Sequence, residues 1–285
     1  MKYLFILSFS LIFGLSSQAQ SYDIFGNSVP SRKKTAPSPR KGTNKTDDQG
    51  RKQGPWEKFY PNGKSIYKAT FKDGKPVGEL IRYFENGKPS AKIIYDQEGL
   101  HGKAKLFNEK GILIATGNYL GKDRDSTWTF YTKKDVISAT ENYKAGKKEG
   151  KTLIYYTNGT LAEEVHWKDD VKEGPWLQYF RNGITKLNAQ YKNGKLEGPY
   201  LFCYVNGKTE IKGNYSNGLE QGEWTFYAAP GKIDYVLQFD HGTVLNPEVL
   251  NNKQQSKFQE FEKNKNQLKD PEVYRNDPEG YIRGR

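Results

Sequence analysis

Few residues of this chain could perform catalysis or bind a metal, and the sequence pattern does not bring them together. The histidines are His101, His166 and His241, and the one cysteine is Cys203. A transition-metal site needs several such ligands at suitable spacing, and a nucleophilic cysteine needs a base beside it. The three histidines fall at different positions of the repeat described below. We therefore predict no metal site and no catalytic residue among these side chains.

Adjacent carboxylates could in principle act as an acid and a base. Two such pairs are Glu163-Glu164 and Asp169-Asp170. Successive residues of a strand point to opposite faces of the sheet, so these pairs are expected to be solvated strand and turn residues. The chain also lacks a phosphate-binding loop, a dinucleotide fingerprint and a nucleophile elbow. The prediction is a protein without enzymatic activity and without a cofactor.

Tryptophan recurs at a fixed place in the sequence. It stands two residues after a regularly spaced glycine, at Trp56, Trp128, Trp176 and Trp224. Tryptophan and tyrosine are frequent anchors of protein interfaces. These four residues are our candidates for partner binding, and the alternative is that they brace the sheet.

A pattern of 24 residues positions these side chains and repeats eight times over residues 54–245 without an insertion or deletion. Such a period is typical of a repeat array in which each unit is completed by its neighbours. The first glycine of each repeat is Gly54, Gly78, Gly102, Gly150, Gly174, Gly198 or Gly222, and Ser126 fills the one gap. Seventeen residues later stands an aromatic column of Phe71, Tyr95, Tyr119, Tyr143, Trp167, Tyr191, Tyr215 and Phe239.

Each repeat contains two short runs with β propensity, and each run ends in a glycine turn. In the repeat from Gly174 these turns are Asn182-Gly183 and Asn193-Gly194. The pattern predicts an all-β fold, an elongated antiparallel β-hairpin repeat array of up to sixteen strands. Because 24 is an even number, each position keeps the same face of the sheet, and the column should stack. The other repeats have an aromatic residue five residues after the first glycine or its replacement, and Cys203 stands at this position in the repeat from Gly198. It is expected to be a small buried side chain.

The first 19 residues have the features of a signal peptide. Lys2 precedes the apolar run Tyr3 to Leu15, and Ser17-Gln18-Ala19 provides small residues before a cleavage point at Gln20. This pattern predicts an exported protein that is periplasmic or associated with the outer membrane. Because no cysteine lies near the cleavage point, a lipoprotein is not expected.

Two further segments flank the array. Residues 20–53 are rich in proline and basic residues, and from residue 21 onward they carry eight Lys or Arg against three Asp or Glu. This composition predicts a disordered basic linker. Residues 246–285 are expected to form a short helix, with Phe258, Phe261 and Leu268 at helical spacing, followed by an irregular tail.

The repeat resembles the MORN-repeat variant family. The shared pattern is G-x-W-x-x-Y-F/Y-x-N-G, followed by an aromatic residue and then x-x-G-K-x-x-x-G. This family includes bacterial proteins labelled YwqK-type antitoxins. Residues 54–78 and 174–198 fit the pattern best, whereas the repeats from Gly102 and Ser126 lack Asn-Gly at their first turn. The resemblance extends over residues 54–245. It implies eight MORN-like repeats and a role in interaction.

From these features we expect an exported, non-enzymatic repeat scaffold that mediates protein–protein interaction in the cell envelope through an unknown partner. One alternative is binding to anionic membrane lipid or cell-wall polymer, for which the basic linker would supply attraction. Another is a YwqK-type antitoxin-like protein, although an antitoxin against a cytoplasmic toxin has no need of a signal peptide. No nucleic-acid partner is expected.

Overall fold

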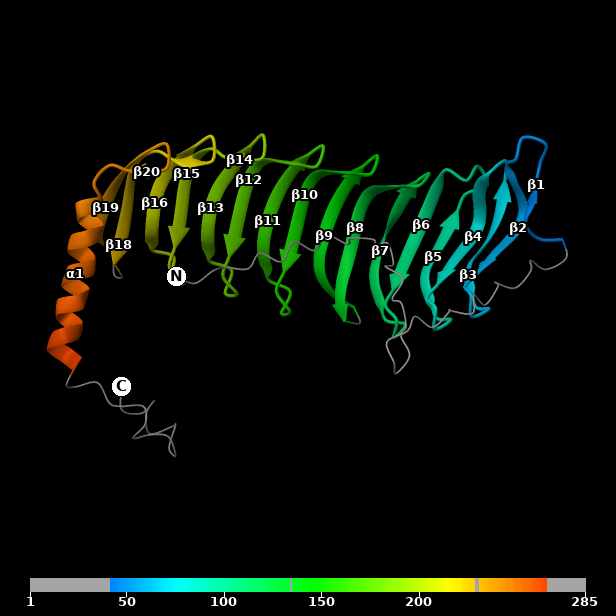
Figure 1. Cartoon of the computed structure of the whole chain (residues 1–285), viewed down its shortest axis with the longest axis horizontal. Helices are drawn as coiled ribbons and strands as arrows, with labels where there is room; N and C mark the ends of the chain where they lie inside the picture. Colours follow the sequence, from blue (N-terminus) through cyan, green and yellow to red (C-terminus); the bar gives the residue numbers. More distant parts are fainter. Residues whose placement is uncertain (1–41, 134, 229–230, 266–285) are drawn as a thin grey trace, which may run out of the picture.

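The computed structural model describes residues 42–133, 135–228 and 231–265. In these ranges the chain forms one long single-layer sheet, with its strands side by side along the long axis and one helix beyond the last strand (Figure 1). The long strands are β2 (Lys52–Phe59), β3 (Ser65–Lys72), β4 (Lys75–Tyr83), β5 (Pro89–Tyr95), β6 (His101–Phe107), β7 (Leu113–Leu120), β8 (Asp123–Lys133), β9 (Val136–Lys144), β10 (Lys147–Tyr155), β11 (Leu161–Lys168), β12 (Val171–Tyr179), β13 (Thr185–Lys192), β15 (Gly198–Cys203), β16 (Thr209–Ser216), β18 (Gly222–Ala228) and β19 (Lys232–Asp240). Four strands of two residues are β1 (Lys45–Thr46), β14 (Lys195–Leu196), β17 (Leu219–Glu220) and β20 (Thr243–Val244), and the helix is α1 (Pro247–Asn264).

Each long strand pairs in antiparallel fashion with the next long strand in the sequence. The sheet is therefore a continuous meander. Its sixteen long strands confirm the predicted all-β hairpin array, and α1 confirms the short C-terminal helix.

The first turn of a repeat closes a hairpin and also contacts the next repeat. In the first repeat the Gly63 N–H donates to the Tyr60 carbonyl (2.9 Å), and the Tyr60 N–H donates to the Lys64 carbonyl (2.8 Å). The Tyr60 hydroxyl then donates to the carbonyl of Tyr83, one repeat further on (3.0 Å). Tyr156 and Tyr204 donate in the same way, to Tyr179 and Tyr227. These bonds tie neighbouring hairpins at one edge of the array.

The second turn explains the glycine pattern. Its two central residues have positive φ, as at Asn193 (+50°) and Gly194 (+78°), which is the geometry of tight hairpins with right-handed twist. The first glycine of the following unit also has positive φ, +65° at Gly78, next to a shift in strand register. Ser126 adopts the same left-handed conformation, with φ of +57°. This conformation occurs at the position in every repeat except the one from Gly102, and it persists where serine replaces glycine.

One face of the sheet contains most of the buried side chains. The position two residues before the aromatic column is buried wherever it is apolar and larger than glycine: Ala69, Ile93, Val165, Ala189 and Leu237. In the column, Tyr95 is buried and the other rings are half-buried. Since no second layer of described residues covers the sheet (Figure 1), these side chains are buried by neighbours on the same face. We call this surface the aromatic face.

Both edges of the sheet are closed by an asparagine side chain. At the first edge, Asn44 donates to the Glu57 carbonyl and accepts from the Glu57 N–H, both at 2.8 Å. At the last edge, Asn246 accepts from the Gln238 N–H (2.8 Å) and donates to the Val236 carbonyl (3.1 Å). Each side-chain amide thus replaces part of a neighbouring strand. Exposed edges favour association between chains, and these caps reduce that exposure.

The segments outside the array differ in part from the prediction. Residues 42–53 belong to the expected disordered linker, yet β1 pairs with the beginning of β2 and extends the sheet. Helix α1 contacts β19 through Lys253, which forms an ion pair with Asp234 and lies over the Tyr235 ring (4.7 Å). No residue of α1 is buried. The remainder of the linker, the expected signal peptide (residues 1–19) and Leu268 lie outside the described residues.

Among the described residues no helix is both long and apolar enough to span a membrane.

Substitutions at the first glycine should test the requirement for left-handed backbone. A Cβ at Gly78 would meet no atom within 4 Å, so Gly78→Ala changes only the conformational preference. We expect it to lower the unfolding free energy by about 1 kcal/mol, measured by denaturant unfolding. Ser126→Gly, at the equivalent position, should have the opposite sign. Destabilisation by both changes would contradict this account.

Candidate functional site

The structure places the four candidate tryptophans on the aromatic face. Each contacts a ring of the column, with centroids between 5.1 and 6.0 Å apart. The pairs are Trp56 with Phe71, Trp128 with Tyr119, Trp176 with Tyr191, and Trp224 with Tyr215. The tryptophans and the column therefore form one continuous aromatic surface.

Two of these tryptophans are buried. Trp128 has no exposed surface and Trp224 is 5% exposed, because each indole lies on a glycine of the preceding strand. A Cβ at Gly117 or at Gly213 would lie 2.2 Å from the indole. Each ring N–H donates to a backbone carbonyl, Trp128 to Asn118 (3.0 Å) and Trp224 to Asn214 (3.2 Å). Side chains this buried brace the sheet.

The other two tryptophans are half-buried and reach solvent. The Trp56 N–H donates to the Lys45 carbonyl (3.1 Å), and the Trp176 N–H donates to the Glu163 carboxylate (2.6 Å). Val165 faces Trp176 where a glycine faces Trp128, so the indole cannot settle as deeply. Of the four candidates, Trp56 and Trp176 are the ones that a partner could contact directly.

Cations form a second component of the aromatic face, which the sequence analysis missed. Lys52, Arg124, Lys148 and Lys172 share one repeat position, two residues before the first glycine or its replacement Ser126. Each lies over rings, with the charged group 4.5 Å from Trp56, 4.6 Å from Trp128, 4.9 Å from Trp167 and 4.7 Å from Tyr191, respectively. Comparison of repeats at this position would have revealed three of them in succession.

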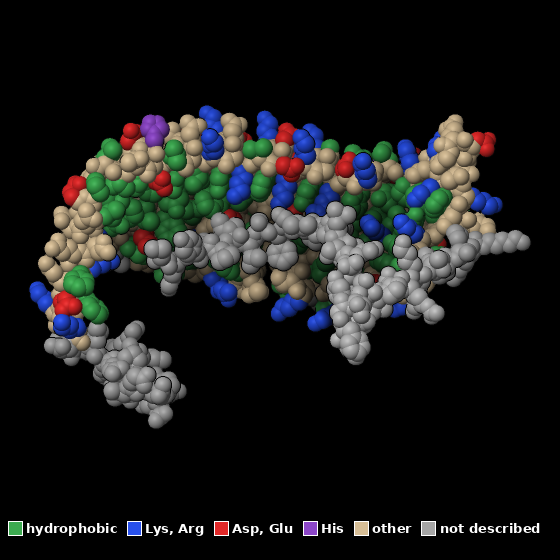
Figure 2. Space-filling view, viewed as in Figure 1, with side chains coloured by type: hydrophobic (Ala, Val, Ile, Leu, Met, Phe, Trp, Pro, Cys, Tyr) green, Lys and Arg blue, Asp and Glu red, His purple; other side chains and the backbone are tan. Residues whose placement is uncertain are grey.

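Cation–π contact holds these groups above the rings and limits their freedom. Figure 2 shows Lys and Arg side chains over the middle strands of the visible face and a hydrophobic area near β18 and β19. The middle of the array is therefore chemically different from its C-terminal end.

Glu141 is a carboxylate within this cationic region. It accepts from Lys148 Nζ (2.7 Å) and from the Tyr143 hydroxyl (2.5 Å). Burial and the neighbouring negative charge of Glu141 raise the pKa of Tyr143 to about 12, although Arg124 acts in the opposite direction. Tyr143 therefore stays protonated at neutral pH and serves as a hydrogen-bond donor to Glu141.

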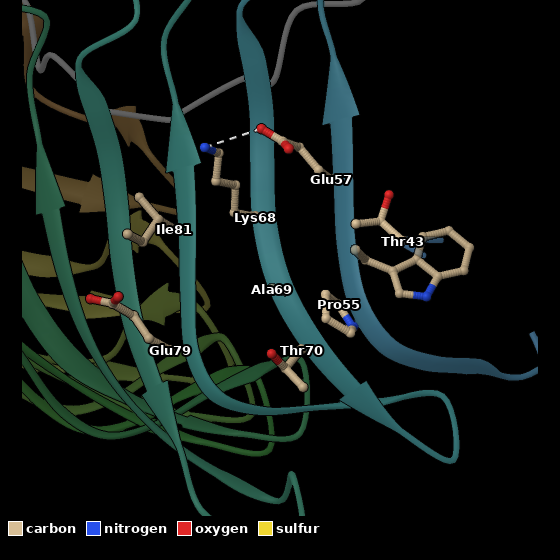
Figure 3. A pocket seen from close by; sticks show the side chains of 9 residues that line it. Thr43, Pro55, Glu57, Lys68, Ala69, Thr70, Glu79 and Ile81 are labelled. Atoms are coloured by element: carbon tan, nitrogen blue, oxygen red, sulfur yellow. Dashed lines mark ion pairs between the residues drawn. The ribbon is translucent and has the colours of Figure 1, made fainter. Parts of the chain in front are cut away.

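The opposite face has a shallow pocket of about 360 Å³ near the first edge. Figure 3 shows Glu57 and Lys68 joined by an ion pair (3.2 Å), while Glu79 lies apart from them. Glu57 also accepts from the Ser65 hydroxyl (2.5 Å) and is only 6% exposed. Its partners already use its carboxylate, so this pocket shows no group poised for chemistry.

The residues considered for catalysis lie apart from one another. His101, His166 and His241 each contact a different carboxylate, Asp96, Glu164 and Asp240, at 2.7 to 2.8 Å. Among the residues that the structure describes, no three His, Cys, Asp or Glu side chains are grouped as a metal site.

The pair Glu163-Glu164 points to opposite faces as expected but is not solvated as expected, because the Glu164 side chain is only 14% exposed. The turn position of Asp169-Asp170 and the burial of Cys203 agree with the prediction. Glu163 contacts Trp176 on the aromatic face, whereas its neighbour Glu164 forms an ion pair with Lys151 (2.8 Å). Asp169 and Asp170 occupy a turn and both have positive φ. Cys203 is buried, and burial raises the pKa of its thiol.

Comparison with known families gives one match. Four segments match the model of the MORN repeat variant, at residues 52–73, 76–97, 148–169 and 172–193. Each segment covers one hairpin, from β2–β3 to β12–β13. No curated protein matches the chain.

The different burial of the tryptophans should appear in stability. Trp128→Ala removes a buried indole from a close contact with Gly117, and we expect it to cost about 3–5 kcal/mol of unfolding free energy. Trp176→Ala removes a half-buried ring and should cost less, on the order of 1–2 kcal/mol. Denaturant unfolding of both variants measures the difference. Equal losses would show that Trp176 is as structural as Trp128.

Proposed function

This protein carries repeats of the MORN repeat variant family, and from that premise we propose that it is an exported, non-enzymatic scaffold that binds a partner protein in the cell envelope. The repeat family is typical of scaffolds that bind proteins or membrane lipids. The non-enzymatic assignment rests on this family. Export rests on the sequence of residues 1–19.

The observation that carries the proposal is the composition of the aromatic face. It offers half-buried rings and cations on one continuous sheet surface, which the other described residues do not cover with a second layer. Trp56 and Trp176 supply the large amphipathic rings that commonly anchor protein interfaces. A repeat array presents such groups at regular intervals, which suits an elongated partner.

A second candidate function is binding to an anionic lipid or cell-wall polymer. Three second turns place lysines directly opposite each other across the hairpin: Lys72 and Lys75, Lys144 and Lys147, and Lys192 and Lys195. Like charges in such pairs are destabilising, and an anionic surface would relieve the repulsion. Binding that falls steeply as salt is added would favour this function over a protein partner. The YwqK-type antitoxin-like role remains a further alternative.

Removal of the accessible tryptophans should weaken partner capture. The double substitution Trp56→Ala with Trp176→Ala is expected to lower recovery of a specific envelope protein at least about tenfold, since interface anchors often contribute 2 kcal/mol or more. Recovery on immobilised full-length protein is quantified by mass spectrometry. Leu177→Ala, beside Trp176 but on the opposite face, is the matched control. An equal loss of recovery in the tryptophan double variant and in the Leu177→Ala control would place the binding surface elsewhere.

Export predicts a processed N-terminus. Protein recovered from the cell envelope should begin at or near Gln20, because Ser17-Gln18-Ala19 provides the cleavage pattern. N-terminal sequencing measures this directly. Recovery of intact Met1 from the cytoplasm would refute export and would favour the antitoxin-like alternative.

A further inference from the structure

Six consecutive strands contribute a row of alternating cations and rings to the middle of the aromatic face. Register places Lys148 opposite Tyr143 and Lys172 opposite Trp167. From β8 to β13 the row is Arg124, Tyr143, Lys148, Trp167, Lys172 and Tyr191. We call it the alternating row.

The cations of the alternating row keep hydrogen-bond donors for a ligand. Arg124 gives one bond to the Tyr143 hydroxyl (3.0 Å), Lys148 gives one to Glu141 (2.7 Å), and Lys172 gives one to the Tyr191 hydroxyl (3.4 Å). A guanidinium has five donors and an ammonium has three. Donors therefore remain on all three cations after these contacts.

Two carboxylates lie on the same face and reduce its positive charge. Glu141 accepts from Lys148, and Glu163 accepts from Trp176 and Gln178. Three cations and these two carboxylates leave an excess of positive charge. The site thus favours an anion but holds its cations in fixed places.

The spacing of the cations selects a chain conformation. Arg124, Lys148 and Lys172 lie on alternate strands, so neighbours are separated by two strand spacings, roughly 9.5 Å. A polyproline II helix repeats every three residues and rises about 9.3 Å per turn. In a β-strand, side chains on one face recur every two residues, about 6.6 Å apart, which does not match the spacing of the cations. Polyproline II also leaves its backbone carbonyls free to accept hydrogen bonds.

We propose that the alternating row binds an acidic segment of a partner protein in polyproline II conformation, with a carboxylate at every third residue. The segment runs along the array from β8 to β13. Its carboxylates meet Arg124, Lys148 and Lys172. This inference rests on the proposed scaffold function and specifies the chemistry of the partner.

The burial of the row favours a narrow chain over a bilayer. The Lys148 side chain is 27% exposed, and its ammonium lies 4.9 Å from the Trp167 ring. An extended segment can follow the sheet surface closely enough to contact cations held in this way.

Peptides of defined spacing test the proposal. Fluorescence anisotropy compares binding of the full-length protein to a labelled Glu-Pro-Pro repeat, a Gln-Pro-Pro repeat, and a Glu-Pro-Pro-Pro repeat with the same number of glutamates. The Glu-Pro-Pro repeat should bind at least about tenfold more tightly than the Gln-Pro-Pro repeat and about fivefold more tightly than the Glu-Pro-Pro-Pro repeat. Equal binding of the two glutamate peptides, or none, would overturn the proposal.

Protein variants locate the site. Arg124→Gln and Lys172→Gln should each weaken peptide binding about two- to fivefold, whereas Lys212→Gln, an exposed lysine on the opposite face, should not. An unchanged affinity in both row variants would contradict the assignment.

Two further outcomes separate the alternatives. If vesicles containing phosphatidylglycerol bind with the same sensitivity to Arg124→Gln and Lys172→Gln, the row serves a membrane surface and the inference is wrong. If the peptide fails to bind while the Trp56 and Trp176 double variant still weakens partner capture, the scaffold function stands and only the peptide assignment fails.

Discussion

Burial of rings on one face of a single-layer sheet is the interaction on which this structure depends. A sheet of this kind has no opposite layer against which to bury apolar surface, so its side chains must cover one another. The 24-residue period makes this possible, because an even number returns each position to the same face. A single inserted residue in a strand would turn the column that follows it to the opposite face. The unbroken register is thus a packing requirement.

Residues with left-handed backbone at and just after the second turns maintain that register. The turn residues reverse the chain, and the glycine that follows lies at a local shift in strand pairing, after which the strand continues in phase with the column. Ser126 shows that the left-handed conformation can persist without glycine, although Gly102 does not adopt it. Closing hydrogen bonds from Tyr60, Tyr156 and Tyr204 act at the opposite edge. Where both kinds of contact occur, they fix both ends of a hairpin relative to its neighbours.

The sequence was sufficient for features that depend on one repeat alone. Two strands per unit, their turns and the aromatic column all follow from local propensity and period. Features that depend on two repeats were harder to predict. The burial of Trp128 depends on Gly117 in the preceding repeat, whereas Val165 keeps Trp176 partly exposed. The edge caps were also missed, since Asn44 and Asn246 act through side-chain amides that imitate a strand. Composition alone assigned Asn44 to a disordered linker.

The repeat positions that vary give the aromatic face its chemical character. The position of Arg124, Lys148 and Lys172 is occupied by Pro76 and Leu100 in earlier repeats, and by Leu196 and Glu220 in later ones. This position pairs directly with the aromatic column in the strand register, as Pro76 does with Phe71 and Glu220 with Tyr215, and the column persists whichever residue occupies it. Constant positions therefore maintain the sheet, while this one can change charge with little effect on the fold. Three successive cations at a position that varies concentrate positive charge over the middle strands. The array thus keeps its sheet constant while its surface chemistry changes from repeat to repeat.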